Sequence, residues 1–134
     1  MNIFADTSGF FALLVKNDYM HVRARNSFNY FAENNVQLVT SSFVLVETVA
    51  LLQNRIGFSP VNDFNAKIFP LLEIVWVDEK WYAKAVQRLV ALNHRRISLV
   101  DALSFEIMEN LQIETAFAFD DHFEENGFCI AAFG

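Results

Sequence analysis

The first ten residues, Met1-Asn2-Ile3-Phe4-Ala5-Asp6-Thr7-Ser8-Gly9-Phe10, decide the fold class. A short apolar run at 2–5 is followed by a polar turn at 6–9, and apolar residues then continue through 15. This order predicts a buried strand, a loop and a helix. The same alternation recurs along the chain. It predicts strands at 36–39, 74–77, 115–119 and 128–131, helices at 19–34, 43–56, 59–72, 79–93 and 98–110, and a short helical turn at 120–125.

Short apolar strands separated by helices are typical of a parallel sheet covered on both faces. We therefore expect an α/β protein, a three-layer α/β/α sandwich whose central parallel sheet has four to five short strands. No repeat, linker or low-complexity block interrupts the 134 residues, so we expect a single domain over residues 1–134. In such sheets ligands bind at the carboxyl ends of the strands, where each strand turns into a helix.

Composition excludes several classes of protein. Four glycines leave no Gly-rich phosphate loop and no nucleophile elbow. The single cysteine, Cys129, cannot form an internal disulfide or a zinc ligand set, which agrees with a reducing compartment. No apolar run reaches the ~18 residues of a membrane span, and nothing near Met1 resembles a signal peptide, so we expect a cytoplasmic protein without membrane contact.

The net charge of −6 argues against broad, metal-free neutralisation of nucleic-acid phosphates. It allows a nucleic-acid enzyme whose metal ions supply positive charge at the reacting phosphate.

Four acidic residues occupy positions where a sheet of this kind forms its site. Asp6 and Asp120 directly follow predicted strands, Glu47 lies in a helical segment that is apolar on nearly every side, and Asp101 follows Ser98 by three residues. Each has an ordinary explanation as a cap, turn residue or solvated side chain, and for Asp101 alone a capping box is the stronger one. The joint pattern is more specific, because converging carboxylates repel one another unless a cation lies between them. Oxygen ligands of this kind suit Mg²⁺ or Mn²⁺.

Four segments resemble the acidic motifs of PIN-domain nucleases in order and spacing: Phe4-Ala5-Asp6-Thr7-Ser8, Ser41-Ser42-Phe43-Val44-Leu45-Val46-Glu47, Ser98-Leu99-Val100-Asp101-Ala102 and Ala118-Phe119-Asp120-Asp121-His122-Phe123. The resemblance covers essentially the whole chain, and the compact size is most similar to VapC-type toxins of bacterial and archaeal toxin–antitoxin pairs. It implies a PIN-like fold and a metal-dependent endoribonuclease that hydrolyses RNA with metal-activated water, using Mg²⁺ or Mn²⁺.

The resemblance implies that four acidic residues surround one or two metal ions: Asp6, Glu47, Asp101 and Asp120. The expected direct ligands are Asp6 and Asp101, with the other two as ligands or water-mediated contacts. Thr7 and Ser98 match polar positions beside these acids, and turn or cap roles explain them equally well. Asp121 can share the role of its neighbour at 120, but the family pattern favours the acid that directly follows the strand.

The basic residues form two small groups, Arg23 with Arg25 and Arg95 with Arg96. Both groups are candidates for RNA phosphates, and the second lies close in sequence to the third acidic motif. A solvated helix end is the alternative explanation for Arg95 and Arg96. His122 is more often a packing or hydrogen-bonding residue than a ligand.

The resemblance also implies partners: an RNA substrate, a small antitoxin that covers the site, and a second copy in a homodimer. Two alternatives stay open, a housekeeping PIN-domain RNA-processing nuclease and a catalytically silent PIN module that binds a partner. A receiver-like phosphoacceptor domain does not fit. It would need a second acid where Thr7 follows Asp6, and a lysine after the last strands, whereas the final lysine is Lys84.

Overall fold

A parallel sheet forms the centre of this computed structural model, which describes residues 1–131. Its five strands are β1 (Asn2–Ala5), β2 (Gln37–Ser41), β3 (Leu72–Val75), β4 (Thr115–Phe117) and β5 (Cys129–Ile130). They lie in the order β3-β2-β1-β4-β5, and every neighbouring pair is parallel. The chain order reverses between β1 and β4, and sheets of this class bind ligands at such a reversal.

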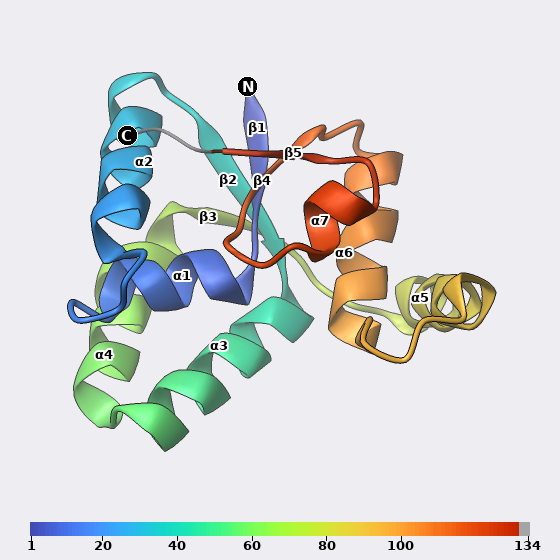
Figure 1. Ribbon diagram of the computed structural model, residues 1–134, viewed down its shortest axis with the longest axis horizontal. Coiled ribbons are helices and arrows are strands. Elements are labelled where there is room, and N and C mark those ends of the chain that lie inside the picture. The colour runs from blue at the N-terminus through green and yellow to red at the C-terminus, as the bar shows by residue number, and fades with distance from the viewer. Residues whose placement is uncertain (132–134) are drawn as a thin grey trace.

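Within residues 1–131, seven α-helices accompany the sheet: α1 (Thr7–Leu14), α2 (His21–Glu33), α3 (Ser42–Arg55), α4 (Phe58–Asp63), α5 (Glu79–Leu92), α6 (Leu99–Asn110) and α7 (His122–Glu125). Figure 1 shows α1, α2 and α4 on one side of the sheet and α5, α6 and α7 on the other, while α3 extends beyond the carboxyl ends of the strands. The predicted three-layer α/β/α fold is confirmed. None of these helices combines the length and apolar character that a membrane span requires.

The core packs against both faces of β1, whose last three residues are fully buried. On one face the ring of Phe10 meets that of Phe64, with centroids 5.1 Å apart. On the other face Phe105 meets Phe123 at 5.2 Å, and Phe123 lies 6.3 Å from Phe4. Burial on both faces explains why β1 reads as a continuous apolar run.

The helix after β1 begins earlier than predicted, because the polar residues there form its first turn. α1 starts at Thr7, and Asp6 is its N-cap, accepting a hydrogen bond from the backbone N–H of Ser8 (3.1 Å). Gly9 lies in this turn directly against β4: a Cβ at this position would lie 2.4 Å from the carbonyl oxygen of Phe117. The strand therefore passes into the helix without a loop, which fixes Asp6 at the sheet edge.

The predicted helix over 59–72 is interrupted. After α4 the chain forms a π-helical turn (Phe64–Ile68) and then a 3-10 turn (Phe69–Leu71) that contains Pro70. Proline has no N–H to donate and cannot continue a regular helix. β3 consequently begins at Leu72, two residues before the predicted start.

The remaining elements occur where the sequence predicts them, with ends that differ by at most two residues. Ser41 is the N-cap of α3, since its Oγ accepts from the N–H of Val44 (3.2 Å). The Oγ of Ser42 instead accepts from the N–H of Val77 (2.9 Å), which ties the segment after β3 to the start of α3.

Replacing Gly9 with alanine tests the close approach of α1 to β4. Alanine in a helix normally stabilises relative to glycine, but here the added Cβ would push against the backbone oxygen of Phe117. We expect Gly9→Ala to lower the free energy of unfolding by about 1–3 kcal/mol in urea denaturation. A variant more stable than the wild type would contradict this packing.

Candidate active site

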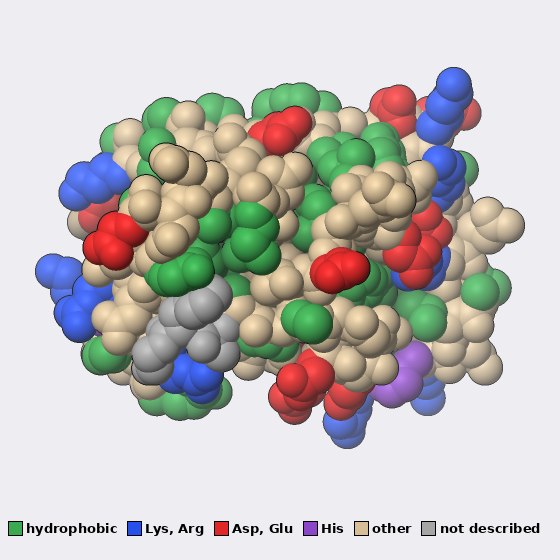
Figure 2. All heavy atoms as spheres, turned by 90° about the horizontal axis from the view of Figure 1, so that it is seen from above, with side chains coloured by type: hydrophobic (Ala, Val, Ile, Leu, Met, Phe, Trp, Pro, Cys, Tyr) green, Lys and Arg blue, Asp and Glu red, His purple; other side chains and the backbone are tan. Residues whose placement is uncertain are grey.

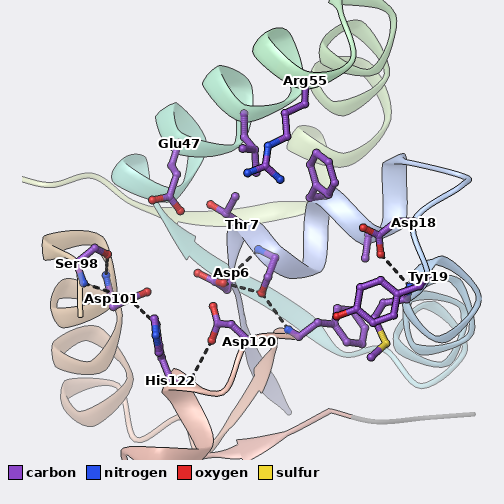
Figure 3. Close-up of a pocket in the computed structure, with 16 residues that line it drawn as sticks. Asp6, Thr7, Asp18, Tyr19, Glu47, Arg55, Ser98, Asp101, Asp120 and His122 are labelled. Atoms are coloured by element: carbon purple, nitrogen blue, oxygen red, sulfur yellow. Dashed lines mark hydrogen bonds and ion pairs between the residues drawn. The ribbon is translucent and has the colours of Figure 1, made fainter. Parts of the chain in front are cut away.

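An open cavity of about 360 Å³ lies at the carboxyl ends of β1 and β4. Figure 3 shows acidic side chains that point into it from separate elements. The lining includes most of the residues that the sequence singled out: Asp6, Thr7, Glu47, Ser98, Asp101, Asp120 and His122. The fold therefore brings together residues from all four acidic motifs.

Asp6 is held by hydrogen bonds on both its backbone and its side chain. Its N–H donates to the carbonyl oxygen of Phe117 (3.1 Å), which joins the ends of β1 and β4. Its Oδ2 accepts from the N–H (3.1 Å) and the Oγ (2.7 Å) of Ser8. The Ser8 Oγ also accepts from the N–H of Phe119 (2.9 Å), so the same hydroxyl fixes the chain that leaves β4.

The burial of Asp6 makes its negative charge costly. The residue is 3% exposed, and burial raises its pKa to about 8, with further contributions from the charges of Asp120 and, less, Asp101. The hydrogen bonds from Ser8 oppose this rise but do not offset it. At neutral pH the carboxyl therefore holds a proton unless a cation lies beside it.

Asp101 completes the capping box of α6, whose N-cap is Ser98, and also lines the cavity. Its N–H donates to the Ser98 Oγ (3.0 Å), and its Oδ2 accepts from the N–H of Ser98 (3.2 Å), which completes a capping box. The Nδ1 of His122 also donates to this Oδ2 (2.9 Å). The capping and site interpretations of Asp101, treated as rivals in the sequence, coexist in the structure. Both bonds use Oδ2, so Asp101 can present Oδ1 to the cavity.

Asp120 is half-buried and close enough to both Asp6 and Asp101 to interact with their charges. Burial raises its pKa, the charge of Asp101 raises it further, and the N–H and charge of His122 oppose the rise. The backbone N–H of His122 donates to the Asp120 Oδ1 (3.1 Å). Among the described residues, Asp101, Asp120 and His122 each offer a possible metal ligand atom, and these atoms lie within 4.8 Å of one another.

Asp121 does not line the cavity. It is exposed and lines a neighbouring depression, together with the basic segment before α6 and with Asp120 and His122. Of the two adjacent acids, Asp120 is therefore the one that the structure brings to the cavity.

The prediction that Glu47 is enclosed by apolar side chains is wrong. α3 buries only one face, through Val44, Thr48 and Leu52, because it extends beyond the sheet; the neighbouring Val46 is 70% exposed. Glu47 is half-buried, and Figure 3 shows its carboxylate facing the cavity from α3. No buried network is needed to hold its charge, since the cavity is open to water.

The two predicted supporting hydroxyls have local partners. The Oγ1 of Thr7 accepts from the Oγ1 of Thr48 (3.1 Å), a buried bond that joins α1 to α3. The Oγ of Ser98 accepts within the capping box of α6. Both hydroxyls therefore position the helices that carry the acids.

Comparison with known proteins identifies the family. The model of the PIN domain matches residues 3–128. The chain belongs to the PIN domain family. It is 33% identical over 127 residues to the 23S rRNA-specific endonuclease VapC20 from two strains of Mycobacterium tuberculosis, and the match covers 94% of this chain and 95% of the relative. The crystal structure of Mycobacterium tuberculosis VapC20, described as a Sarcin-Ricin loop cleaving toxin, matches with a TM-score of 0.82 and 32% identity, again over 94% and 95% of the two chains.

The predicted basic groups of this PIN domain lie in different places. Arg95 and Arg96 are exposed and line the depression that adjoins Asp120 and His122. Arg23 and Arg25 are exposed on α2 and line neither this depression nor the cavity. Figure 2 shows the face at the amino ends of the strands, where Lys and Arg side chains lie mainly toward the periphery.

Sequence reasoning gave no role to two residues of the PIN-domain site, Ser8 and Arg55. A serine two residues after an N-cap aspartate is placed to bond its carboxylate, as Ser8 does. His122 is expected to pack or to form hydrogen bonds, and the structure shows that it forms hydrogen bonds to two of the acids. Arg55 lines the cavity from the end of α3, and nothing in its sequence surroundings indicates this.

The raised pKa of Asp6 predicts how stability depends on pH in EDTA. The pKa of the folded state, about 8, exceeds the ordinary 3.8, so the folded state binds the proton more tightly and stability falls as the pH rises between these values. Asparagine keeps an oxygen that accepts from Ser8. We expect Asp6→Asn to flatten the fall in melting temperature between pH 5 and pH 8 and to melt above the wild type at pH 8. Parallel melting curves for the two proteins would show that Asp6 is not buried beside other acids.

Proposed function

We propose that this PIN domain is a metal-dependent endoribonuclease, the toxin of a toxin–antitoxin pair, which hydrolyses RNA phosphodiester bonds with metal-activated water. The observation that carries the proposal is the meeting of Asp6, Asp101 and Asp120 in one cavity from the ends of β1 and β4 and the start of α6. The similarity to VapC20 over 94% of the chain supports it.

The residues of the cavity fit a hard divalent cation, Mg²⁺ or Mn²⁺. They offer carboxylate oxygens, and the raised pKa of Asp6 marks buried negative charge that a cation would offset. In the proposal Asp6 and Asp101 hold the ion directly, and Asp120 and Glu47 act as further ligands or through water. When bound, the ion lowers the pKa of the attacking water and stabilises charge at the phosphate.

The protein's own groups orient this set of acids. Ser8 fixes the Asp6 carboxylate, and His122 holds Asp101 through its ring and Asp120 through its backbone. Asp6, whose pKa is raised, would give up its proton if a cation were held beside it. In the proposal Thr7 and Ser98 act by keeping the helices of these acids in place.

The relative's name suggests the first substrate to test. VapC20 is called a 23S rRNA-specific endonuclease, and we propose ribosomal RNA in the cytoplasm as the substrate class of this chain. We further propose that residues 1–134 act as a single domain, that the toxin forms a homodimer, and that a small antitoxin protein covers the cavity. A housekeeping RNA-processing nuclease would use the same site without such an antitoxin.

The first test is RNA cleavage by the purified protein, with ribosomal and synthetic RNAs incubated with Mg²⁺, Mn²⁺ or EDTA. We expect cleavage with either ion and none in EDTA, and we expect Asp6→Asn, Asp101→Asn and Asp120→Asn each to lower the rate by about 100-fold or more. The matched variant Asp121→Asn should keep most of the activity, because its carboxylate lies outside the cavity. Cleavage that survives EDTA would reject the metal-dependent mechanism. Loss of activity in Asp121→Asn with full activity in Asp120→Asn would reject the choice of Asp120 as the site residue.

The basic depression predicts a change in the salt dependence of RNA binding. Arg95→Ala with Arg96→Ala removes two cations beside Asp120, so the slope of log affinity against log salt should fall by about 1–2. Affinity for Mn²⁺ should stay nearly unchanged, because these arginines are not ligands. The control is Arg23→Ala with Arg25→Ala on α2, which should alter the slope less. An equal effect of both double variants would assign RNA binding to general surface charge.

A further inference from the structure

The cavity that holds the acids has a second end of different character. Beyond the acids at the ends of the strands its lining continues with aromatic, apolar and charged side chains: Phe11, Asp18, Tyr19, Met20, Leu51 and Arg55. These residues come from α1, from the segment between α1 and α2, and from α3. The proposed chemistry uses none of them, although they share one open space with the acids.

Arg55 is the cation of this second end. It lies in the last turn of α3, where a positive charge suits the helix dipole. Its guanidinium carbon lies 5.8 Å from the ring centroid of Phe11, and Figure 3 shows the side chain directed into the cavity. Of the described residues that line the cavity, it is the one lysine or arginine, and within residues 1–131 it forms no ion pair. It can therefore bind an anion from solution.

Tyr19 is an uncovered aromatic side chain on a fixed turn. The residue is 85% exposed, yet the backbone around it is ordered by hydrogen bonds. Met20 N–H donates to the Asp18 Oδ1 (2.8 Å), and His21 N–H donates to the Asp18 carbonyl (3.0 Å). The His21 Nδ1 then donates to the carbonyl of Ala12 (2.9 Å), which anchors the turn to α1. A ring on a rigid turn can stack on a ligand with little loss of backbone entropy.

We propose that Tyr19 and Arg55 form a subsite for an unpaired nucleotide that flanks the scissile phosphate, with the base stacked on Tyr19 and a neighbouring phosphate bound by Arg55. Exposed aromatic rings and arginine are the groups by which proteins bind unpaired nucleotides. The charge pattern of the cavity agrees: its acidic end accepts a phosphate only with a cation, whereas Arg55 attracts the backbone directly. The subsite rests on the proposed function, since both ends serve one RNA strand.

The subsite selects the form of RNA that can be cut. In a duplex each base is covered on both faces by its neighbours, so the ring of Tyr19 has no free face to meet. An unpaired or looped nucleotide exposes such a face. Whether the nucleotide beside the cut is paired or unpaired, rather than phosphate contact alone, therefore decides how well an RNA binds.

The test uses fluorescein-labelled single-stranded RNA and the same sequence in a duplex, bound to Asp120→Asn protein so that cleavage does not interfere. We expect Tyr19→Ala to lower the affinity for single-stranded RNA about tenfold and Tyr19→Phe to keep it. Arg55→Gln should also lower this affinity, and Arg55→Lys should keep part of it. Duplex binding should change little. In the active protein the same losses should appear in KM with kcat nearly unchanged.

The matched controls are Tyr82→Ala and Lys80→Ala, exposed residues of α5 that lie outside the cavity, and melting curves confirm that each variant is folded. Equal single-strand binding by wild type, Tyr19→Ala and Arg55→Gln would overturn the subsite. So would variants that lose only a protein partner from the native host while RNA binding is intact. A protein that binds single strands in the expected pattern but cleaves no RNA would keep the subsite and reject the proposed nuclease.

Discussion

The side chains of Asp6, Asp101 and Asp120 bring three carboxyl groups into one cavity, and the cost of burying their charges, increased by their mutual repulsion, is the constraint that the surrounding structure has to meet. Each carboxylate has donors from its own neighbourhood: Ser8 for Asp6, the N–H of Ser98 and the ring of His122 for Asp101, and the N–H of His122 for Asp120. These bonds fix the positions of the oxygens without removing the cost of burying Asp6. Burying charged groups that a site needs for its chemistry lowers the free energy of unfolding, and active sites commonly show such a loss of stability.

The same cavity joins two kinds of surface. One end is built from strand and helix termini, where caps and backbone N–H groups hold the acids rigidly. The other end is built from the last turn of α3 and the turn before α2, where Arg55 and Tyr19 reach solvent. A substrate that spans both ends meets charge that is fixed before it arrives, and this spares the reorganisation that a flexible site would require. An open cavity with two such ends thus suits a strand better than a compact ligand.

The sequence predicted the fold class, the order of strands and helices along the chain, and four acids that the structure brings to one cavity. Each of these predictions depends on local patterns. A continuous apolar run predicts a buried strand, and an acid directly after it predicts a helix cap. Prediction from the sequence failed where the packing of several elements determines the result. Gly9, in the first turn of α1, packs against β4, and Glu47 faces an open cavity because α3 extends beyond the sheet; neither fact is visible in neighbouring residues. Arg55 joins the cavity only through the packing of α3 on α1, which no local pattern reports.

The pairing of β1 with β4 also governs when the protein can become active. β1 is made first, and β2 and β3 follow on one side of it, but the strand that fills its other side comes after α5 and α6. During synthesis at ~5–20 residues per second, β1 therefore waits for several seconds as an open edge. A nascent chain carries Asp6 long before it carries Asp120. The cavity of the nascent chain therefore lacks one of its acids until β4 has emerged and docked.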